Sequence, residues 1–433
     1  MKPTNSKSRM NKPNVSGQDS VSRYRMPSVL IDKSGVEFSF DGEVLLKCPE
    51  NLEGEYVIPD GVKEIYRNAF SNCIGLTSVI IPNSVTSIGQ EAFSGCESLR
   101  KIHIPSSITS IEFWTFSDCR SLQKVYIPNS VTSIGIGAFE SCHSLQKIHI
   151  PDSVTEICDC AFSGCSSLQE IRIPGSVTEI GECLFAGCDS LVSVVVAPDN
   201  PVYDSRQNCN AIIKTESSAL VVGCKTTVIP DSVIIIDDCA FSGVSLQEMH
   251  IPESVTRIES YAFSNCGSLQ TINIPDSVTD IGFRAFCSCR SLKSVEFPSS
   301  VTSIGSQVFF DCANLTSAII GTACIEYETF KDCKSLLTVV LLDNVQYIKE
   351  SAFHNCVSLE SVNLPEGLKS IARAAFAGCE KLTSVTLPSS GTIVHKEAFD
   401  STTAIIVPQG AEEALDRKLA GFSLIDKEDI RDE

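Results

Sequence analysis

The sequence lacks a hydrophobic segment long enough to cross a bilayer. A membrane-spanning helix needs about 20 mostly apolar residues, whereas one of the longest apolar runs, Leu336–Leu342, has the length of a strand. Residues 1–26 contain several lysines and arginines but no apolar core of the kind found in secretory signals. These absences predict no membrane span and, by this criterion alone, a cytoplasmic address.

An excess of positive charge is also missing. Lysine and arginine number 34 against 53 aspartates and glutamates, which gives a formal net charge of −19 at pH 7. Nucleic acids and anionic membrane surfaces repel such a chain. We therefore expect no general binding to nucleic acid, although a local basic patch remains compatible with this balance.

Motifs that carry catalysis are absent as well. The chain contains no P-loop, no H-E-x-x-H, no G-x-S-x-G and no G-x-G-x-x-G before a helix. Of the six histidines, His103 and His149 share a repeat position but lie two repeats apart, about 10 Å at the usual strand spacing. That separation is too long for one shared metal ion. We expect no enzyme activity, no cofactor and no metal site.

The sequence does contain phenylalanines at regular intervals. Fourteen phenylalanines recur at steps of 21 to 23 residues, with one longer gap: Phe70, Phe93, Phe116, Phe139, Phe162, Phe185, Phe241, Phe263, Phe286, Phe309, Phe330, Phe353, Phe376 and Phe399. A fixed period of this length is typical of proteins built from stacked repeats, in which each unit contacts only its neighbours.

Each repeat combines two short apolar alternations with a turn. In the unit that starts at Leu122, Pro128 separates the alternations because it fixes φ and lacks an N–H. The positions expected to face inward are Leu122, Val125, Ile127, Val131, Ile134 and Phe139. Stacking in register, about 4.8 Å per unit, buries them as parallel strands. The pattern predicts a mainly β leucine-rich-repeat solenoid of about fifteen stacked coils with parallel sheets.

Cysteines follow the same period. Of the 21 cysteines, twelve lie three residues after a repeat phenylalanine: Cys73, Cys96, Cys119, Cys142, Cys165, Cys188, Cys266, Cys289, Cys312, Cys333, Cys356 and Cys379. They could serve metal or redox chemistry, or they could be small buried hydrophobic residues. Metal ligands must converge on one point, whereas a ladder spreads along an axis. The ladder therefore favours a packing role.

The repeated phrase Ile-Pro-x-Ser-Val-Thr-x-Ile-Gly-x-x-Ala-Phe-x-x-Cys-x-Ser-Leu covers about residues 57–400. It resembles the BspA-like class of leucine-rich repeats. This resemblance implies a protein of bacterial type, similar to surface proteins that take part in adhesion and in binding host or matrix proteins. The class also occurs in some parasitic protists.

Segments outside the repeat suggest caps. Residues 27–56 contain a predicted hairpin at Asp41-Gly42, suited to cover an open solenoid end. The expected organisation is a disordered tail over 1–26, an N-terminal cap over 27–56, the solenoid over 57–400, and a C-terminal cap with a charged tail over 401–433. In that last cap we expect a strand Ala404–Pro408, a helix Gly410–Leu419 and a strand Phe422–Ile425.

The long gap between Phe185 and Phe241 predicts an irregular coil at about residues 191–229. Ala211–Ile213 and Ala219–Val222 are expected to form a hairpin that projects from the stack. The segment is either a binding loop, with Tyr203 and Arg206 as contacts, or a variant coil without a function of its own. The sequence leaves both explanations open.

The outward positions of the first strand predict a candidate binding surface. The second and fourth residues after each repeat leucine should face outward and line the concave face of a curved array. In the early repeats this surface is cationic with one tyrosine: Arg100, Lys101, His103, Lys124, Tyr126, Lys147, His149 and Arg172. Since like charges on adjacent strands repel, we hypothesise a protein partner with an acidic segment, or an anionic glycan. Alternatively, lysines simply keep exposed strands polar.

Two functions therefore fit the sequence. One is a non-catalytic bacterial adhesion or host-interaction protein that uses its strand face, and the other is an intracellular protein–protein interaction scaffold. The family resemblance favours the first, while the absent signal and the many thiols favour the second.

Overall fold

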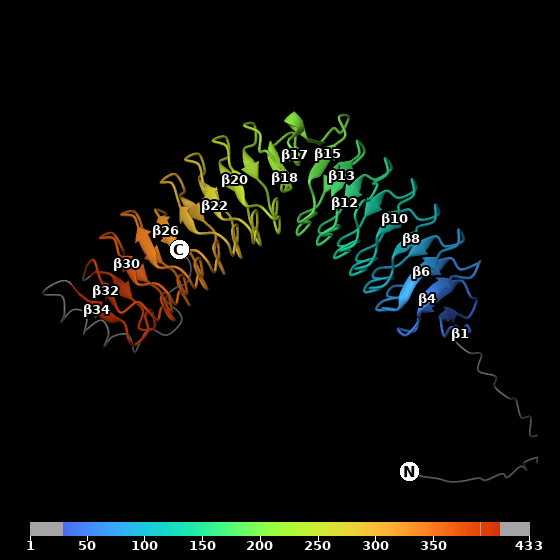
Figure 1. The fold of residues 1–433 in the computed structure, drawn as a ribbon, viewed down its shortest axis with the longest axis horizontal. Coiled ribbons are helices and arrows are strands. Elements are labelled where there is room, and N and C mark those ends of the chain that lie inside the picture. The colour runs from blue at the N-terminus through green and yellow to red at the C-terminus, as the bar shows by residue number, and fades with distance from the viewer. Residues whose placement is uncertain (1–28, 390, 408–433) are drawn as a thin grey trace, which may run out of the picture.

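The computed structural model describes residues 29–389 and 391–407. These residues form a mainly β solenoid of about 16 turns, which follows a curved arc (Figure 1). The described residues include one 3-10 helix, η1 (Arg206–Asn208). The predicted mainly β solenoid with parallel sheets is confirmed. The tail predicted over 1–26, the helix Gly410–Leu419 and the strand Phe422–Ile425 lie outside the described residues.

One side of the coils carries strands of three to five residues, which we call the longer-strand face. They pair in parallel between successive coils in most of the array. These strands are β4 (Gly54–Val57), β6 (Leu76–Ile80), β8 (Lys101–His103), β10 (Lys124–Tyr126), β13 (Glu170–Ile173), β15 (Ser193–Val196), β20 (Glu248–His250), β22 (Thr271–Asn273), β24 (Ser294–Glu296), β26 (Ser317–Ile320), β28 (Thr338–Leu341), β30 (Ser361–Asn363), β32 (Ser384–Thr386) and β34 (Ala404–Ile406).

A second side carries strands of two residues, which we call the shorter-strand face. In most coils they follow a proline turn, and they also pair in parallel. These strands are β5 (Glu64–Ile65), β7 (Ser87–Ile88), β9 (Ser110–Ile111), β11 (Ser133–Ile134), β12 (Glu156–Ile157), β14 (Glu179–Ile180), β19 (Ile235–Ile236), β21 (Arg257–Ile258), β23 (Asp280–Ile281), β25 (Ser303–Ile304), β27 (Cys324–Ile325), β29 (Tyr347–Ile348), β31 (Ser370–Ile371) and β33 (Ile393–Val394).

The repeat phenylalanines form a continuous stack inside each half of the array. The ring of Phe139 is fully buried, with its centroid 5.4 Å from that of Phe116 and 5.6 Å from that of Phe162. Each pair of rings is close to parallel. The turn that carries each phenylalanine is also bonded to its neighbour, as Phe139 N donates to Ala161 O at 2.8 Å. The repeat therefore buries one aromatic ring per coil, as its period predicts.

The cysteine three residues after each phenylalanine lies in the core. The Cys142 thiol donates to the carbonyl oxygen of Phe116 at 3.2 Å, and Cys165 does the same to Phe139. Both side chains are fully buried, and burial raises the pKa of the Cys165 thiol to about 12. These thiols are neutral packing groups, which confirms the packing role that the ladder favours.

The N-terminal end is covered by a small antiparallel unit. The strands β2 (Glu37–Ser39) and β3 (Val44–Lys47) form the predicted hairpin, and β1 (Val29–Ile31) adds a further strand. The unit joins the shorter-strand face because β3 pairs in parallel with β5. At the other end, β34 pairs with β32 and is the last strand described.

The insertion between Phe185 and Phe241 is a layer of the stack. It contains β16 (Tyr203–Asp204), β17 (Ala211–Lys214) and β18 (Ala219–Gly223), and β17 and β18 form the predicted antiparallel hairpin. The expectation that this hairpin projects is wrong, because β18 pairs in parallel with β19 and most of its residues are buried. The hairpin strands β17 and β18 carry apolar side chains on both faces, so both faces must be covered by neighbouring layers.

The core divides at this insertion into two apolar clusters. One extends from Val36 to Cys224, and the other from Cys209 to Ala398. Gly223 lies where the two meet, and an added Cβ there would come within 2.1 Å of the Phe241 ring. The glycine thus lets β18 lie directly against the first phenylalanine of the second half.

Candidate functional site

The cationic residues predicted from the early repeats lie on the longer-strand face. Lys101 and His103 of β8 are exposed, and the Ile102 side chain between them is buried. The same alternation in β10 leaves Lys124 and Tyr126 exposed around the half-buried Val125. The outward direction of these positions is thus the one expected from the period of two.

β8 and β10 place equal charges side by side. They pair in parallel, with Lys124 directly opposite Lys101 and Tyr126 opposite His103. Within residues 29–389 and 391–407, neither lysine takes part in an ion pair. Like charges opposite each other on neighbouring strands destabilise the pair, so this part of the surface holds positive charge that the protein itself does not neutralise.

An aromatic platform lies next to the two lysines. The rings of His103 and Tyr126 stack with centroids 5.1 Å apart and an interplanar angle of 13°. Tyr126 is 58% exposed. The tyrosine ring is therefore accessible to a planar or sugar group, with two ammonium groups in adjacent positions.

The remaining residues of the predicted surface are less uniform. Lys147 forms an ion pair with Glu170 at 2.7 Å, and Arg172 lies opposite Val195 in the pairing of β13 with β15. His149 and Arg100 are exposed. Among the described strands β10 pairs only with β8, so the surface is interrupted before Lys147. The structure therefore brings Lys101, His103, Lys124 and Tyr126 together most closely.

Tyr203 and Arg206 of the insertion have partners within the protein. Tyr203 is 5% exposed, and its hydroxyl accepts a hydrogen bond from the backbone N–H of Ile180 at 3.2 Å. The Arg206 guanidinium forms two hydrogen bonds with the carboxylate of Asp204, at 2.8 and 2.7 Å. The Tyr203 contact holds the insertion against the preceding coil, and the Arg206–Asp204 bonds lie within the insertion, so both side chains have a structural role.

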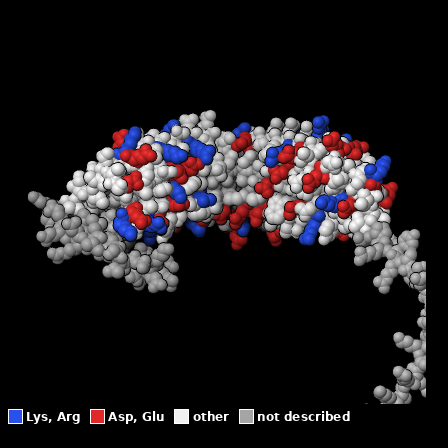
Figure 2. Space-filling view, turned by 90° about the horizontal axis from the view of Figure 1, so that it is seen from below, with Lys and Arg blue, Asp and Glu red and all other residues white. Residues whose placement is uncertain are grey.

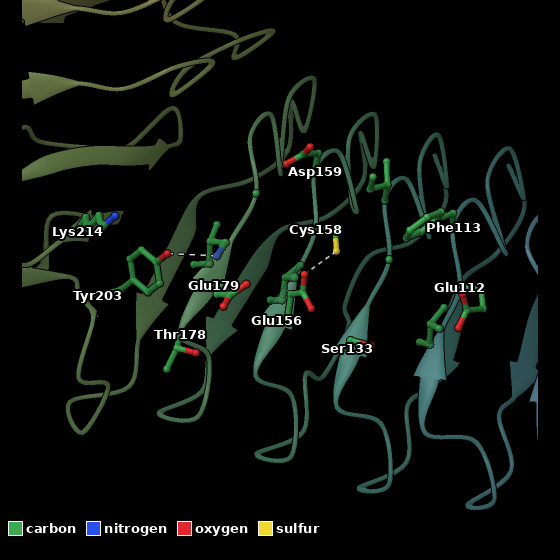
Figure 3. A pocket seen from close by; sticks show the side chains of 16 residues that line it. Glu112, Phe113, Ser133, Glu156, Cys158, Asp159, Thr178, Glu179, Tyr203 and Lys214 are labelled. Atoms are coloured by element: carbon green, nitrogen blue, oxygen red, sulfur yellow. Dashed lines mark hydrogen bonds between the residues drawn. The ribbon is translucent and has the colours of Figure 1, made fainter.

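A groove of about 700 Å³ lies on the shorter-strand face, where the insertion meets the regular coils. In Figure 3, Glu112, Ser133, Glu156 and Glu179 come from successive coils along the groove, and Tyr203 and Lys214 stand at the insertion side. This groove was not predicted from the sequence. The available sequence signal for the groove was the pair Glu156 and Glu179, which occupy the same position beside the second apolar alternation of their repeats.

The groove belongs to an acidic region in the middle of the array. Figure 2 shows the hollow side of the arc, where acidic side chains gather over the middle coils. Burial, and after it the charges of Asp238 and Asp159, raise the pKa of Glu182. Burial also raises the pKa of Asp237, with Asp238 adding to the effect. Negative charge is thus concentrated here on coils before and after the insertion.

The cysteines supply no activated nucleophile to this groove. Cys158 lines it, and its thiol donates to Glu156 at 3.4 Å. Burial, followed by this hydrogen bond, raises the pKa of Cys158 to about 11, so the thiol stays protonated at neutral pH. Among the described residues, no group of three or more His, Cys, Asp or Glu side chains could hold a metal ion.

One disulfide bond closes the insertion. Cys183 and Cys239 are 56 residues apart in sequence, and their Cα atoms lie 5.0 Å apart. The other 19 cysteines are free. This pair was not predicted from the sequence, although both cysteines lie two residues before a repeat phenylalanine and therefore share a column.

The repeats match a family model described as BspA type leucine-rich repeat region, in six copies over residues 63–192, 219–335 and 323–424. The matched segments cover most of the chain and leave out the start of the insertion. The chain belongs to the BspA-type leucine-rich repeat family. Proteins of this repeat family are typically non-catalytic.

Solved structures of bacterial leucine-rich repeat proteins resemble the BspA-type chain. A leucine-rich cell surface protein of Faecalibacterium prausnitzii A2-165 is 29% identical, covers 73% of this chain and 95% of its own, and has a TM-score of 0.58. A leucine-rich repeat protein of Eubacterium ventriosum is 25% identical over 86% and 93% of the two chains, with a TM-score of 0.61.

A third similar structure shows the fold alone. The pneumococcal vaccine antigen PcpA is 19% identical, covers 88% of this BspA-type chain and 99% of its own, and has a TM-score of 0.59. No curated protein matches the chain in sequence. In the part of the chain that the structure describes, no helix is both long and apolar enough to span a membrane.

Proposed function

We propose that the protein is a non-catalytic bacterial surface protein that binds an acidic partner on its longer-strand face. The observation that carries the proposal is the cross-strand pair of Lys101 and Lys124, which have no acidic partner among the described residues. A negatively charged ligand bound between the two ammonium groups removes their repulsion, and this relief adds to the binding free energy. The surface location is supported by the likeness to a protein described as a cell surface protein.

The platform beside the lysines determines which ligands fit. The stacked rings of His103 and Tyr126 offer a flat, partly apolar surface, and the two ammonium groups offer charge-assisted hydrogen bonds to carboxylates or sulfates. This combination suits either an acidic protein segment or an anionic glycan. The longer-strand face holds such a partner in an extended form, because successive coils repeat the same positions.

Charge reversal at both lysines tests the ligand-binding part of the proposal. We expect Lys101→Glu with Lys124→Glu to weaken binding of a labelled oligo-glutamate peptide and of a sulfated polysaccharide by about a hundredfold, measured by fluorescence anisotropy. The matched control reverses two exposed lysines of later coils, Lys293→Glu with Lys334→Glu. Equal affinity of the two double variants would exclude this surface as the binding site.

A second candidate function is an intracellular interaction scaffold, and the 19 free cysteines favour it. Protease treatment of intact cells separates the two. If the protein is a surface protein, we expect external protease to remove most of it while a cytosolic marker stays intact. If the protein stays intact until the cells are lysed, the surface proposal fails and the scaffold remains.

A further inference from the structure

The ladder of shorter strands is interrupted at β14. On one side β14 pairs with β12, but the next strand, β16, pairs with β17 and not with β14. Instead of a strand, the Tyr203 side chain spans the gap and accepts a hydrogen bond from the N–H of Ile180. At this edge β14 therefore has no neighbouring strand among the described residues, and the Tyr203 hydroxyl occupies the N–H of Ile180.

This edge presents two backbone acceptors. In the preceding coil, the carbonyl oxygen of Thr155 accepts from Thr178 N at 2.9 Å, and that of Ile157 accepts from Gly181 N at 2.8 Å. The equivalent carbonyl groups one coil later belong to Thr178 and Ile180, and no N–H of the described residues donates to them. Thr178 is exposed and Ile180 is half-buried. An exposed strand edge with free carbonyl groups can accept another strand.

The groove beside the edge is more negative than positive, because Glu112, Glu156, Asp159 and Glu179 line it with the single cation Lys214. Glu156 and Glu179 lie directly opposite each other in the pairing of β12 with β14, and Asp159 lines the same groove. Across the described ranges, none of these three carboxylates takes part in an ion pair. Two like charges on adjacent strands oppose the pairing that holds them, and a bound cation relieves that cost.

We propose that this groove binds an extended, lysine- or arginine-containing segment of a partner protein, which adds to β14 as a further strand. N–H groups of the segment donate to the carbonyl oxygens of Thr178 and Ile180. Glu156 and Glu179 lie side by side across β12 and β14, so a basic residue opposite Glu179 in the added strand extends its long side chain over the same face toward both carboxylates. Complementary charge identifies the occupant, and this site is separate from the cationic longer-strand face.

The test is a binding measurement on the full chain. The probe is a fluorescent ten-residue peptide that alternates lysine with valine or threonine, titrated at about 50 mM salt. We expect Glu156→Gln with Glu179→Gln to weaken binding by at least about tenfold, since two charge-assisted hydrogen bonds are lost. The matched control, Glu248→Gln with Glu296→Gln, removes two exposed carboxylates from the longer-strand face and should leave the affinity unchanged.

A second peptide separates strand pairing from simple charge attraction. It has the same sequence, but its alternate backbone nitrogens are methylated, so it keeps the charge and loses the N–H donors. We expect this peptide to bind at least about tenfold more weakly. Equal binding of the two peptides, or equal loss in the control variant, overturns the proposal.

The basic N-terminal segment of the chain is an alternative occupant, and a truncated protein tests it. Residues 1–28 carry Lys2, Lys7, Arg9, Lys12, Arg23 and Arg25. If a partner segment is the occupant, a chain without residues 1–28 binds the peptide with the same affinity as the full chain. A gain of about tenfold or more on truncation would mean that the chain's own segment competes for the groove, and it would overturn the assignment to a partner.

Discussion

Replacing Phe139 with alanine is expected to lower the free energy of unfolding by about 3–5 kcal/mol. The side chain is fully buried and stacks between Phe116 and Phe162, with centroids 5.4 and 5.6 Å away. Neighbouring coils are held in register by hydrogen bonds on several sides, so they cannot collapse into the space that is left. The loss is measured by guanidinium unfolding, followed by the circular dichroism of the strands and the fluorescence of Trp114, the single tryptophan.

The matched control is Phe399→Ala at the end of the stack. Phe399 contacts Phe376 on one side, with ring centroids 5.0 Å apart, and is only half-buried. Its removal leaves less unfilled space, so the free energy of unfolding should fall by about half as much or less. Equal losses at the two positions would contradict the view that stability comes from contacts between adjacent coils.

Removing the disulfide with Cys183→Ser and Cys239→Ser is expected to cost about 4 kcal/mol of stability. The bond closes a loop with a sequence separation of 56 residues, and the unfolded chain gains entropy when that loop opens. Since the bond joins the coils on either side of the insertion, its loss should loosen the boundary between the two apolar clusters. Thermal unfolding with and without a thiol reductant measures the effect.

The reductant supplies an internal control for the disulfide. It should lower the unfolding temperature of the unmodified protein and have no effect on the double serine variant. Cys324→Ser, which changes a half-buried free cysteine, should leave the response to reductant unchanged. If the unmodified protein and the double serine variant unfold at the same temperature, the bond does not contribute to stability.

The coil could be predicted from the sequence because its signals are local and repeated. Leu122, Val131 and Phe139 are all fully buried, and each was identified from its place in the 23-residue period. The turn cysteines were correctly assigned to the core, since a ladder of thiols cannot converge on one metal. The N-terminal hairpin was also recognised from Asp41-Gly42, whereas β1 carries no turn signal of its own.

The insertion was only partly predictable, because its contacts are long-range. The two strands of the hairpin were found from their composition, but their place in the stack depends on the pairing of β18 with β19. An unbroken apolar run at Ala211–Ile213 was the available signal for burial on both faces. The Cys183–Cys239 bond was missed because only the stacking of coils across the insertion brings these residues together.

The longer-strand face and the groove beside β14 also differ in how far the sequence could predict them. The outward columns of the longer-strand face follow from alternation within each strand, so Lys101, Lys124 and Tyr126 could be placed from the sequence. The ion pair between Lys147 and Glu170 depends on side-chain conformation. The groove beside β14 arises where the repeat is interrupted, and a periodic pattern gives no information about the place where it stops.

The equivalence of the coils also affects how such a molecule can change in length. Every regular coil presents the same leucine, isoleucine and phenylalanine contacts to the coil before it and to the coil after it. The gain or loss of one complete 23-residue unit therefore joins two surfaces that already fit each other. Genetic duplication or deletion can lengthen or shorten the arc in steps of about 5 Å while each remaining coil keeps its packing. The exception is the segment between Phe185 and Phe241, whose neighbours are unique, and this segment gives the molecule a fixed reference point along its length.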